Sequence, residues 1–447
     1  DPSHHLVLLP FVSSFYEPLP LRSSRTSPSA AGYPHDMPAW VPIPFLSIAL
    51  LCAVSLAISF ILRKARIPGF PIIAGLIAGV LLGPSFLGRI APDFHERLFI
   101  GGASERITLN HVLARENADQ YLAETFDARV IDAQSAAASR PSISEARLSL
   151  ESARRQHQRP LRIMASLLAT LLVLTSALMS FERHNPARMF ALNIGLWSFT
   201  LPAAVALFAS LLLFDCDRYQ SALVATAVGI SPLFLLPFDR RIARNVEPAG
   251  PATLQFASRI AALLAVLIAL WAFLSSQQGL APTMIPPLVA FPVSWLLHAC
   301  LKAVRTSLRM RRKLARAVIT SHSLLLPPLA ALASIHVEIF HAFSIWPTLL
   351  ILVLADDGRW AGALVGSILT AGRDPLPTFR LLLPTLSAGS AQLLLTSLAA
   401  ITHTLPPPII LSLLLGVALI ELTTNLRRRV AVRFKQLHDD FPSLDEF

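Results

Sequence analysis

Residues 67–88 read IPGFPIIAGLIAGVLLGPSFLG and contain no charged side chain. At about 1.5 Å per residue, a helix of this length covers the ~30 Å hydrocarbon core of a bilayer. Lipid offers the backbone no hydrogen-bond partner, so an apolar stretch that crosses it has to be helical. Gly75, Gly79 and Gly83 recur every four residues and leave one face bare, on which a second helix can pack closely. The stretch therefore predicts a transmembrane helix with a close neighbour, interrupted after Gly83 by Pro84.

The same apolar pattern recurs along most of the chain. Hydrophobic residues make up 54% of the 447 residues and charged residues 15%, well below the ~25% of a soluble domain. Mean hydropathy is +0.58, and charge is nearly absent from long windows and dense between them. This distribution predicts an all-α polytopic membrane protein with about eleven transmembrane helices and the lipid bilayer as its partner. The predicted spans are 40–62, 67–88, 163–181, 189–214, 219–238, 252–274, 281–301, 317–341, 343–370, 381–402 and 404–426.

The distribution of basic residues predicts the orientation. If eleven spans alternate, six polar segments fall on one side and hold 22 of the 38 Lys and Arg residues, whereas the short loops opposite hold Arg218. Basic flanks favour the cytoplasm, which predicts a multi-pass protein of the cell (cytoplasmic or inner) membrane with its N-terminus outside and its C-terminus inside. The net charge of +11 arises from these flanks and forms no basic domain, so no nucleic-acid partner is expected. The six segments are 63–66, 182–188, 239–251, 302–316, 371–380 and 427 onward.

Composition divides the chain into five parts. These are a disordered N-terminal tail (1–39), transmembrane helices 1–2 (40–88), an extracytoplasmic insertion (89–160), transmembrane helices 3–11 (161–430) and a cytoplasmic tail (431–447). The Pro- and Ser-rich tail has a signal peptide as its second interpretation. The insertion balances Arg against acidic residues and predicts two helices, over about 111–138 and 143–158, the second supported by the i,i+4 pair Glu151 and Arg155.

Three stretches resemble one known family. The sequence RIPGFPIIAG from Arg66 and the sequence GPSFLG from Gly83 closely resemble the second helix of the monovalent cation:proton antiporter (sodium/hydrogen exchanger) superfamily. Residues 222–232 look like the family's fifth-helix stretch, and residues 384–392 fall where the family has a second helix break. The resemblance covers roughly 40–435 without the insertion. It implies an antiporter-like bundle with two broken helices, often a homodimer, that moves small cations and protons by alternating access.

Both predicted breaks carry small or helix-breaking residues in the middle of a span. Gly229 and Pro232 flank Ser231, and Gly389 precedes Ser390. Interrupted helices free backbone carbonyls at depth, and secondary transporters build ion sites from such groups. An ordinary proline kink is the alternative interpretation of the second stretch.

The chain departs from the family at the position that matters most. The family's sixth helix carries one or two acidic residues that bind the proton or cation, but the corresponding stretch here holds Arg259, Ala261 and Ala262. The family usually has twelve or thirteen spans, so this bundle is shortened as well. The resemblance therefore implies a divergent member with an altered ion site.

Charged residues inside predicted spans are costly and mark candidate sites. Arg259 lies in the sixth predicted span, and Asp356, Asp357 and Arg359 lie near the middle of the ninth. Two interpretations remain open for residues 343–370. They form either two short segments that meet at a polar turn near Gly358, or one span in which Asp356 or Asp357 pairs with Arg259.

Other titratable residues favour packing or interfacial roles. His322, His336 and His341 lie around the eighth span and titrate in a range suited to proton sensing or relay, but their spacing does not match a metal site. Glu338 and Glu421 lie nearer span ends, where they can reach water. No nucleophile motif, phosphate loop or dinucleotide fingerprint occurs, which predicts neither an enzyme nor a bound cofactor or metal.

Two functions follow from these observations. The leading hypothesis is a secondary transporter of the cation:proton antiporter type, exchanging H⁺ against Na⁺ or K⁺ at an altered ion site. The rival is a divergent relative that transports nothing and acts as a membrane scaffold or sensor through residues 89–160; the missing sixth-helix acids favour it.

Overall fold

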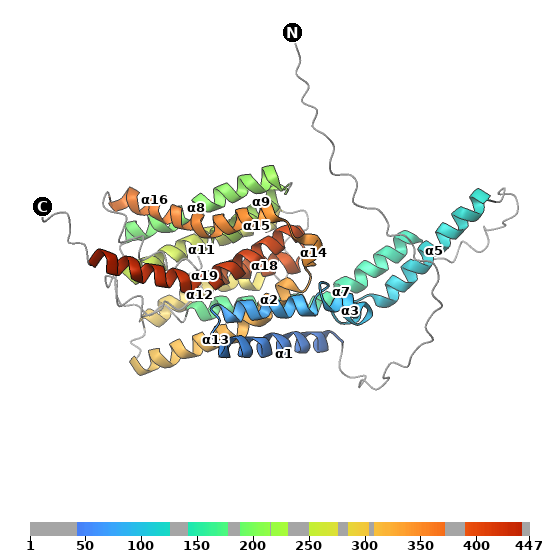
Figure 1. Ribbon diagram of the computed structural model, residues 1–447, viewed down its shortest axis with the longest axis horizontal. Helices are drawn as coiled ribbons and strands as arrows, with labels where there is room; N and C mark the ends of the chain where they lie inside the picture. Colours follow the sequence, from blue (N-terminus) through green and yellow to red (C-terminus); the bar gives the residue numbers. More distant parts are fainter. Residues whose placement is uncertain are drawn as a thin grey trace, which may run out of the picture. The chain divides into compact units, whose positions relative to one another are not determined.

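The structure is a computed structural model that describes residues 43–125, 142–177, 188–214, 216–230, 250–275, 285–303, 308–371 and 389–439. Within these ranges every regular element is a helix, which confirms the predicted all-α fold (Figure 1). All described residues belong to one compact unit, Pro42–Phe447. The predicted tail 1–39 lies outside them, and the predicted tail 431–447 is helical through Asp439.

The helices follow one another along the chain as α1 (Ile43–Lys64), α2 (Phe70–Leu82), α3 (Leu87–Ile90), α4 (Pro92–His95), the π-helix η1 (Glu96–Ile100), α5 (Ala103–Thr125), α7 (Ile143–Ala177), α8 (Arg188–Leu213), α9 (Arg218–Gly229), α11 (Gly250–Ser275), α12 (Ile285–Ala303), α13 (Leu308–Ser334), α14 (Ile339–Ala342), α15 (Ile345–Val353), the π-helix η4 (Leu354–Gly358), α16 (Arg359–Ala371), α18 (Ser390–Ile401) and α19 (Pro407–Asp439).

Four of these helical segments are long and apolar enough to cross a membrane: Ile43–Lys64, Phe70–Ile90, Met189–Leu213 and Arg316–Ser334. Several shorter helices are apolar as well, among them Ser390–Ile401 and Pro407–Thr423. Large apolar side chains also face outward from the bundle; Leu212 is 77% exposed. Such side chains are costly in water and at no disadvantage in lipid. These properties are those of a helical membrane protein, and the count of eleven spans remains a prediction.

The glycine face of α2 packs against α13. A Cβ at Gly75 would collide with the carbonyl of Pro327, and a Cβ at Gly79 would lie 2.6 Å from the carbonyl oxygen of Ala331. The Ser334 hydroxyl of α13 crosses the same interface to donate to the carbonyl of Leu76 at 3.4 Å. The predicted close neighbour is therefore α13, held at a distance that only glycine permits.

Residues 83–90 continue α2 in a less regular form. Gly83 is also too crowded for a side chain, because a Cβ there would lie 2.6 Å from the carbonyl of Gly79. After Pro84, the Ser85 hydroxyl accepts from the backbone N–H of Ile339 at 2.9 Å and donates to the carbonyl of Val337 at 3.4 Å. The predicted interruption at Pro84 thus becomes a second attachment of this segment to the turn that follows α13.

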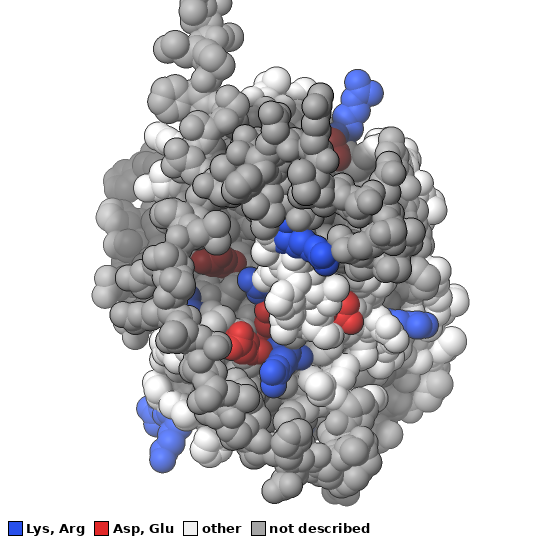
Figure 2. Space-filling model, turned by 90° about the vertical axis from the view of Figure 1, so that its right-hand side faces the viewer, with Lys and Arg blue, Asp and Glu red and all other residues white. Residues whose placement is uncertain are grey.

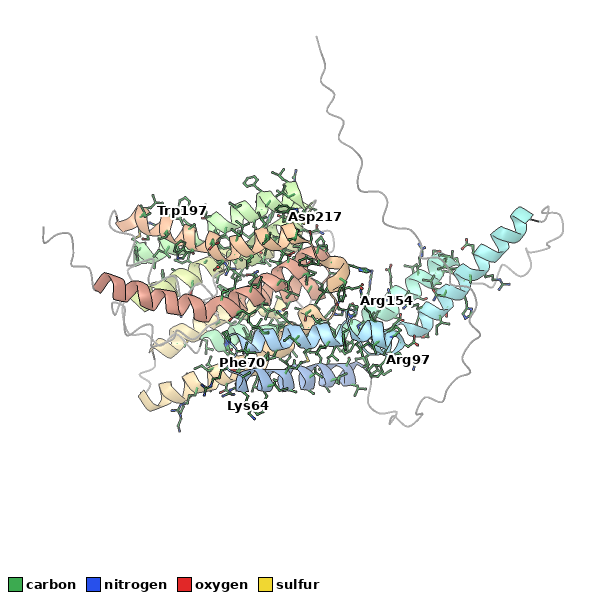
Figure 3. The ribbon with its side chains drawn as sticks, in the orientation of Figure 1. Lys64, Phe70, Arg97, Arg154, Trp197 and Asp217 are labelled. Atoms are coloured by element: carbon green, nitrogen blue, oxygen red, sulfur yellow. The ribbon has the colours of Figure 1, made fainter. Side chains whose placement is uncertain are left out.

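A second glycine face, on α16, packs against α8. Gly358, the last residue of η4, and Gly362 and Gly366 of α16 recur every four residues. A Cβ at Gly362 would collide with the carbonyl of Trp197 on α8; Trp197 is labelled in Figure 3. On another side of α8, Gly195 lies directly against the backbone of Ala257 in α11. Helix α8 is consequently in close backbone contact with both α16 and α11.

The predicted insertion forms a helical arm joined to the bundle. Helix α5 begins at Ala103, earlier than the predicted 111, and residues 126–138 lie outside the described part. The predicted helix 143–158 does not end there: α7 runs on past Pro160 to Ala177, so one 35-residue helix joins the arm to the apolar bundle. Glu96 links both arm helices, since it accepts from Arg106 at 2.7 Å and lies 3.9 Å from Arg154.

On the face in Figure 2, the visible basic and acidic side chains lie interspersed.

We expect Gly79→Leu to destabilise the protein, because the side chain has to push α2 away from α13. Overpacking of this kind costs about 1–3 kcal/mol, which a thermal unfolding scan of the detergent-solubilised protein resolves. The control is Ala57→Leu on the exposed face of α1, which we expect to leave the unfolding temperature unchanged. Equal unfolding temperatures for Gly79→Leu and wild type would contradict the α2–α13 packing.

Candidate functional site

The candidate site centres on Arg359, a charged side chain buried inside the bundle. Only 1% of its surface is exposed. Its Nε donates to the carbonyl of Val228 at 2.6 Å, and its Nη2 donates to Oε1 of Gln392 at 3.0 Å. Arg359 therefore joins three helices that are distant in sequence: α9, α16 and α18.

Arg359 satisfies the end of α9. That helix ends at Gly229, and the residues around its end, Val228 to Ile230, are buried. The last carbonyls of a helix have no partner within it and carry partial negative charge. A guanidinium is suited to this position because it supplies both a donor and a positive charge.

Glu421 satisfies the start of α18 in the same way that Arg359 satisfies the end of α9. Its Oε1 accepts from the backbone N–H of Gly389, the N-cap residue, at 2.7 Å, and the residue is 8% exposed. The partial positive charge at a helix N-terminus stabilises a carboxylate placed beside it. The expectation that Glu421 reaches water is wrong, because α2 covers it: Gly69, the N-cap of α2, lies so close that a Cβ there would collide with the Glu421 side chain. The position of Glu421 near a span end had suggested exposure to water. The signal that was overlooked is the glycine at the start of each neighbouring helix, Gly69 before α2 and Gly389 before α18, which lets the backbone approach Glu421 closely.

The two aspartates lie in a widened helical turn next to Arg359. Residues Leu354–Gly358 form the π-helix η4 between α15 and α16, so the chain is continuously helical from Ile345 to Ala371. The interpretation of two segments meeting at a polar turn is therefore wrong. Asp356 is partly buried and acts electrostatically on Arg359, whereas Asp357 is exposed. Single π-turns inside α-helices are frequent at functional sites.

The proposed pairing of Asp356 or Asp357 with Arg259 does not occur. Arg259 lies on α11, partly buried, and forms no ion pair with any residue in the described ranges. The physical reason is the position of α8, which packs against α11 through Gly195 and against α16 through Gly362. Asp356, which the hypothesis paired with Arg259, therefore interacts electrostatically with Arg359 instead.

The remaining predicted residues fall in different places. Gly229 is buried at the end of α9 against Phe199, whereas Ser231 and Pro232 lie outside the described residues. Gly389 is the N-cap of α18, and the buried Ser390 hydroxyl has no hydrogen-bond partner within the described part of the chain. Gln392 was missed, because a lone glutamine in an apolar span carries no motif. In the described ranges no group of three or more His, Cys, Asp or Glu residues is placed to hold a metal ion.

We expect Arg359→Met to lower the unfolding temperature of the detergent-solubilised protein. The change leaves two buried acceptors, the Val228 carbonyl and Gln392 Oε1, without their donors, at about 1–3 kcal/mol each, partly offset because no guanidinium is buried any longer. Arg259→Met is the matched control: it removes a partly buried arginine that has no such partners among the described residues, and it should cost far less. Equal losses for the two variants would contradict the role of Arg359 as a link between helices.

Comparison with known proteins adds no family to this geometry. No model of a known protein family matches the sequence, and no curated protein matches it either. The function is therefore argued from the site itself and from the stretches that resemble the antiporter superfamily.

Proposed function

We propose that the chain is a secondary transporter of the cation:proton antiporter type, which exchanges H⁺ against Na⁺ or K⁺ at an altered site. The observation that carries the proposal is the buried Arg359, which bridges the end of α9 and the start of α18. Helix ends buried inside a bundle are the parts from which secondary transporters build ion sites. The resemblance of residues 66–88 to the antiporter superfamily supports the same class.

In this proposal the acidic groups of the site come from η4. Asp356 and Asp357 lie in η4, one turn or less before Arg359. The superfamily has its acids on a different helix, the one that corresponds to α11. A carboxylate can hold either a proton or a cation, and this mutual exclusion is what couples the two fluxes. Arg359 remains the fixed positive charge that keeps the helix ends together during this exchange.

The wider architecture belongs to the proposal too. Eleven spans with the N-terminus outside and the C-terminus in the cytoplasm account for the basic flanks of the predicted spans. The same basic flanks favour a location in the cell membrane, and a homodimeric assembly is what the superfamily resemblance implies. The glycine-lined contacts of α2 with α13 and of α8 with α16 give two tightly packed helix pairs, which could move as units during alternating access.

One observation favours the rival function. Helix α7 continues without interruption from the arm into the bundle, so a partner bound to the arm could act on the bundle through a single rigid element. A transport-inactive scaffold or sensor would use this connection. The same transport assay separates the two functions.

We expect purified protein in vesicles to release a trapped proton gradient when Na⁺ or K⁺ is added, measured with a pH-sensitive dye. Asp356→Asn combined with Asp357→Asn should slow this release at least about tenfold, because an amide cannot exchange a proton for a cation. Asp93→Asn, an exposed position in α4, is the control and should keep the wild-type rate. Full activity of the double variant would remove both aspartates from the mechanism, and an inactive wild type would favour the scaffold or sensor.

A further inference from the structure

A cavity opens at the end of the bundle where α18 turns into α19. Its volume is about 290 Å³, and its lining comes from α9, from the turn after α13, and from the α18–α19 turn with the start of α19. It shares no lining residue with the Arg359 site. The space is large enough for a small organic molecule.

The polar side of the cavity consists of hydrogen-bonding groups without negative charge. The imidazoles of His336 and His403 lie 5.6 Å apart, centre to centre, in an edge-on arrangement. Gln220 contributes the remaining polar side chain of the lining, and its Oε1 already accepts from the N–H of Asp217 at the N-cap of α9. Among the described residues that line the cavity, none is acidic.

The charged groups around the imidazoles reinforce this polarity. Arg162 of α7 acts electrostatically on both His336 and His403, and His95 of α4 acts on His336. The buried Nε of Arg162 and the buried Nε2 of His95 have no hydrogen-bond partner in the part of the chain that the structure describes. Glu338, two residues beyond His336, is directed to Arg89 at 3.3 Å and to His341 at 3.9 Å. The surroundings of the cavity are therefore rich in donors, with Arg162 as their positive charge. Two acidic groups lie nearby: Glu96 beside His95 is paired with Arg106 and Arg154, and Asp217 beside Gln220 caps α9.

The opposite side of the cavity is aliphatic. Leu405, Pro406, Pro407 and Ile410 line it, together with Val337 and Ala400. A ligand that satisfies both sides has an anionic end and a short hydrocarbon part. A metal ion would leave the aliphatic side without a partner, and any cation meets like charge from Arg162.

We propose that this cavity binds a small organic carboxylate, with its carboxylate on the imidazoles of His336 and His403 and its hydrocarbon against the aliphatic side. Hydrogen bonds between a carboxylate and a protonated imidazole are charge-assisted and stronger than neutral ones. The inference concerns binding and does not depend on the transport function.

The site makes binding depend on pH in a defined direction. Burial, and then the charge of Arg162, lower the pKa of His403 below its ordinary value, so the free imidazole is neutral near pH 7. A bound carboxylate favours the imidazolium and raises that pKa again. Binding should therefore take up protons, and affinity should increase as the pH falls.

The test is calorimetric titration of the full-length protein in detergent with butyrate, 1-butanol and butylamine. These probes share a four-carbon chain and differ in charge. We expect butyrate to bind about tenfold or more tightly than either of the others, and more tightly at about pH 6 than at about pH 8. Equal binding of butyrate and butanol, or a butyrate affinity that does not change with pH, would overturn the proposal.

Variants locate the site. His336→Gln combined with His403→Asn removes both imidazoles, and Asn tolerates the positive φ of 54° at position 403. This double variant should bind butyrate about tenfold more weakly, whereas His341→Gln, an exposed histidine outside the lining, should bind it as wild type does. Wild-type affinity in the double variant would overturn the assignment. If that variant does not fold, the charge and pH comparisons on the wild-type protein still decide.

Discussion

The carbonyl of Val228, at the buried end of α9, has to find a hydrogen-bond donor inside the protein. Neither lipid nor an apolar core can supply one, and an unsatisfied carbonyl there costs more than almost any single packing contact. Arg359 supplies the donor and at the same time reaches Gln392 on α18. Since Glu421 holds the first N–H of α18 in the same way, each of these buried helix ends is matched by a side chain of opposite charge.

This arrangement depends on how closely the surrounding helices approach one another. Gly362 of α16 lies directly on the backbone of Trp197 in α8, and Gly75 of α2 lies on the backbone of Pro327 in α13. Such contacts fix the positions of α16 and α2, and with them Arg359 and the start of α2 beside Glu421. In a membrane, where burying apolar surface gains little, close backbone contact of this kind is a main source of helix association. The hydrogen bonds of Arg359 and Glu421 to the helix ends therefore depend on the close helix contacts that the glycines allow.

The sequence predicted the helical fold and the glycine face of α2 because both are local patterns. A four-residue glycine repeat and a long uncharged run are visible without knowing any partner. Partners were harder to predict. Arg259 was matched with Asp356 and Asp357 because all three lie inside predicted spans and the superfamily often pairs a charge on its sixth helix with one on a later helix, but α8 lies between them. The role of Gln392 was missed and Glu421 was expected to reach water, since their partners Arg359 and Gly389 lie 33 and 32 positions away in the chain. The π-turn at Leu354–Gly358 carries no pattern at all that distinguishes it from a polar turn.

The position of Arg359 also limits how a cation could use this site. Free carbonyls at a broken helix are suitable ligands for Na⁺ or K⁺, but here a permanent guanidinium already occupies the Val228 carbonyl. A cation in the same place would meet a like charge at close range in a medium of low dielectric constant, where repulsion is strong. It would have to bind instead on the side of Asp356 and Asp357, where the helix is widened and the carboxylates are at least partly exposed. In the proposed transporter, the position of Arg359 therefore leaves the turn that carries Asp356 and Asp357, and not the end of α9, as the place for the cation.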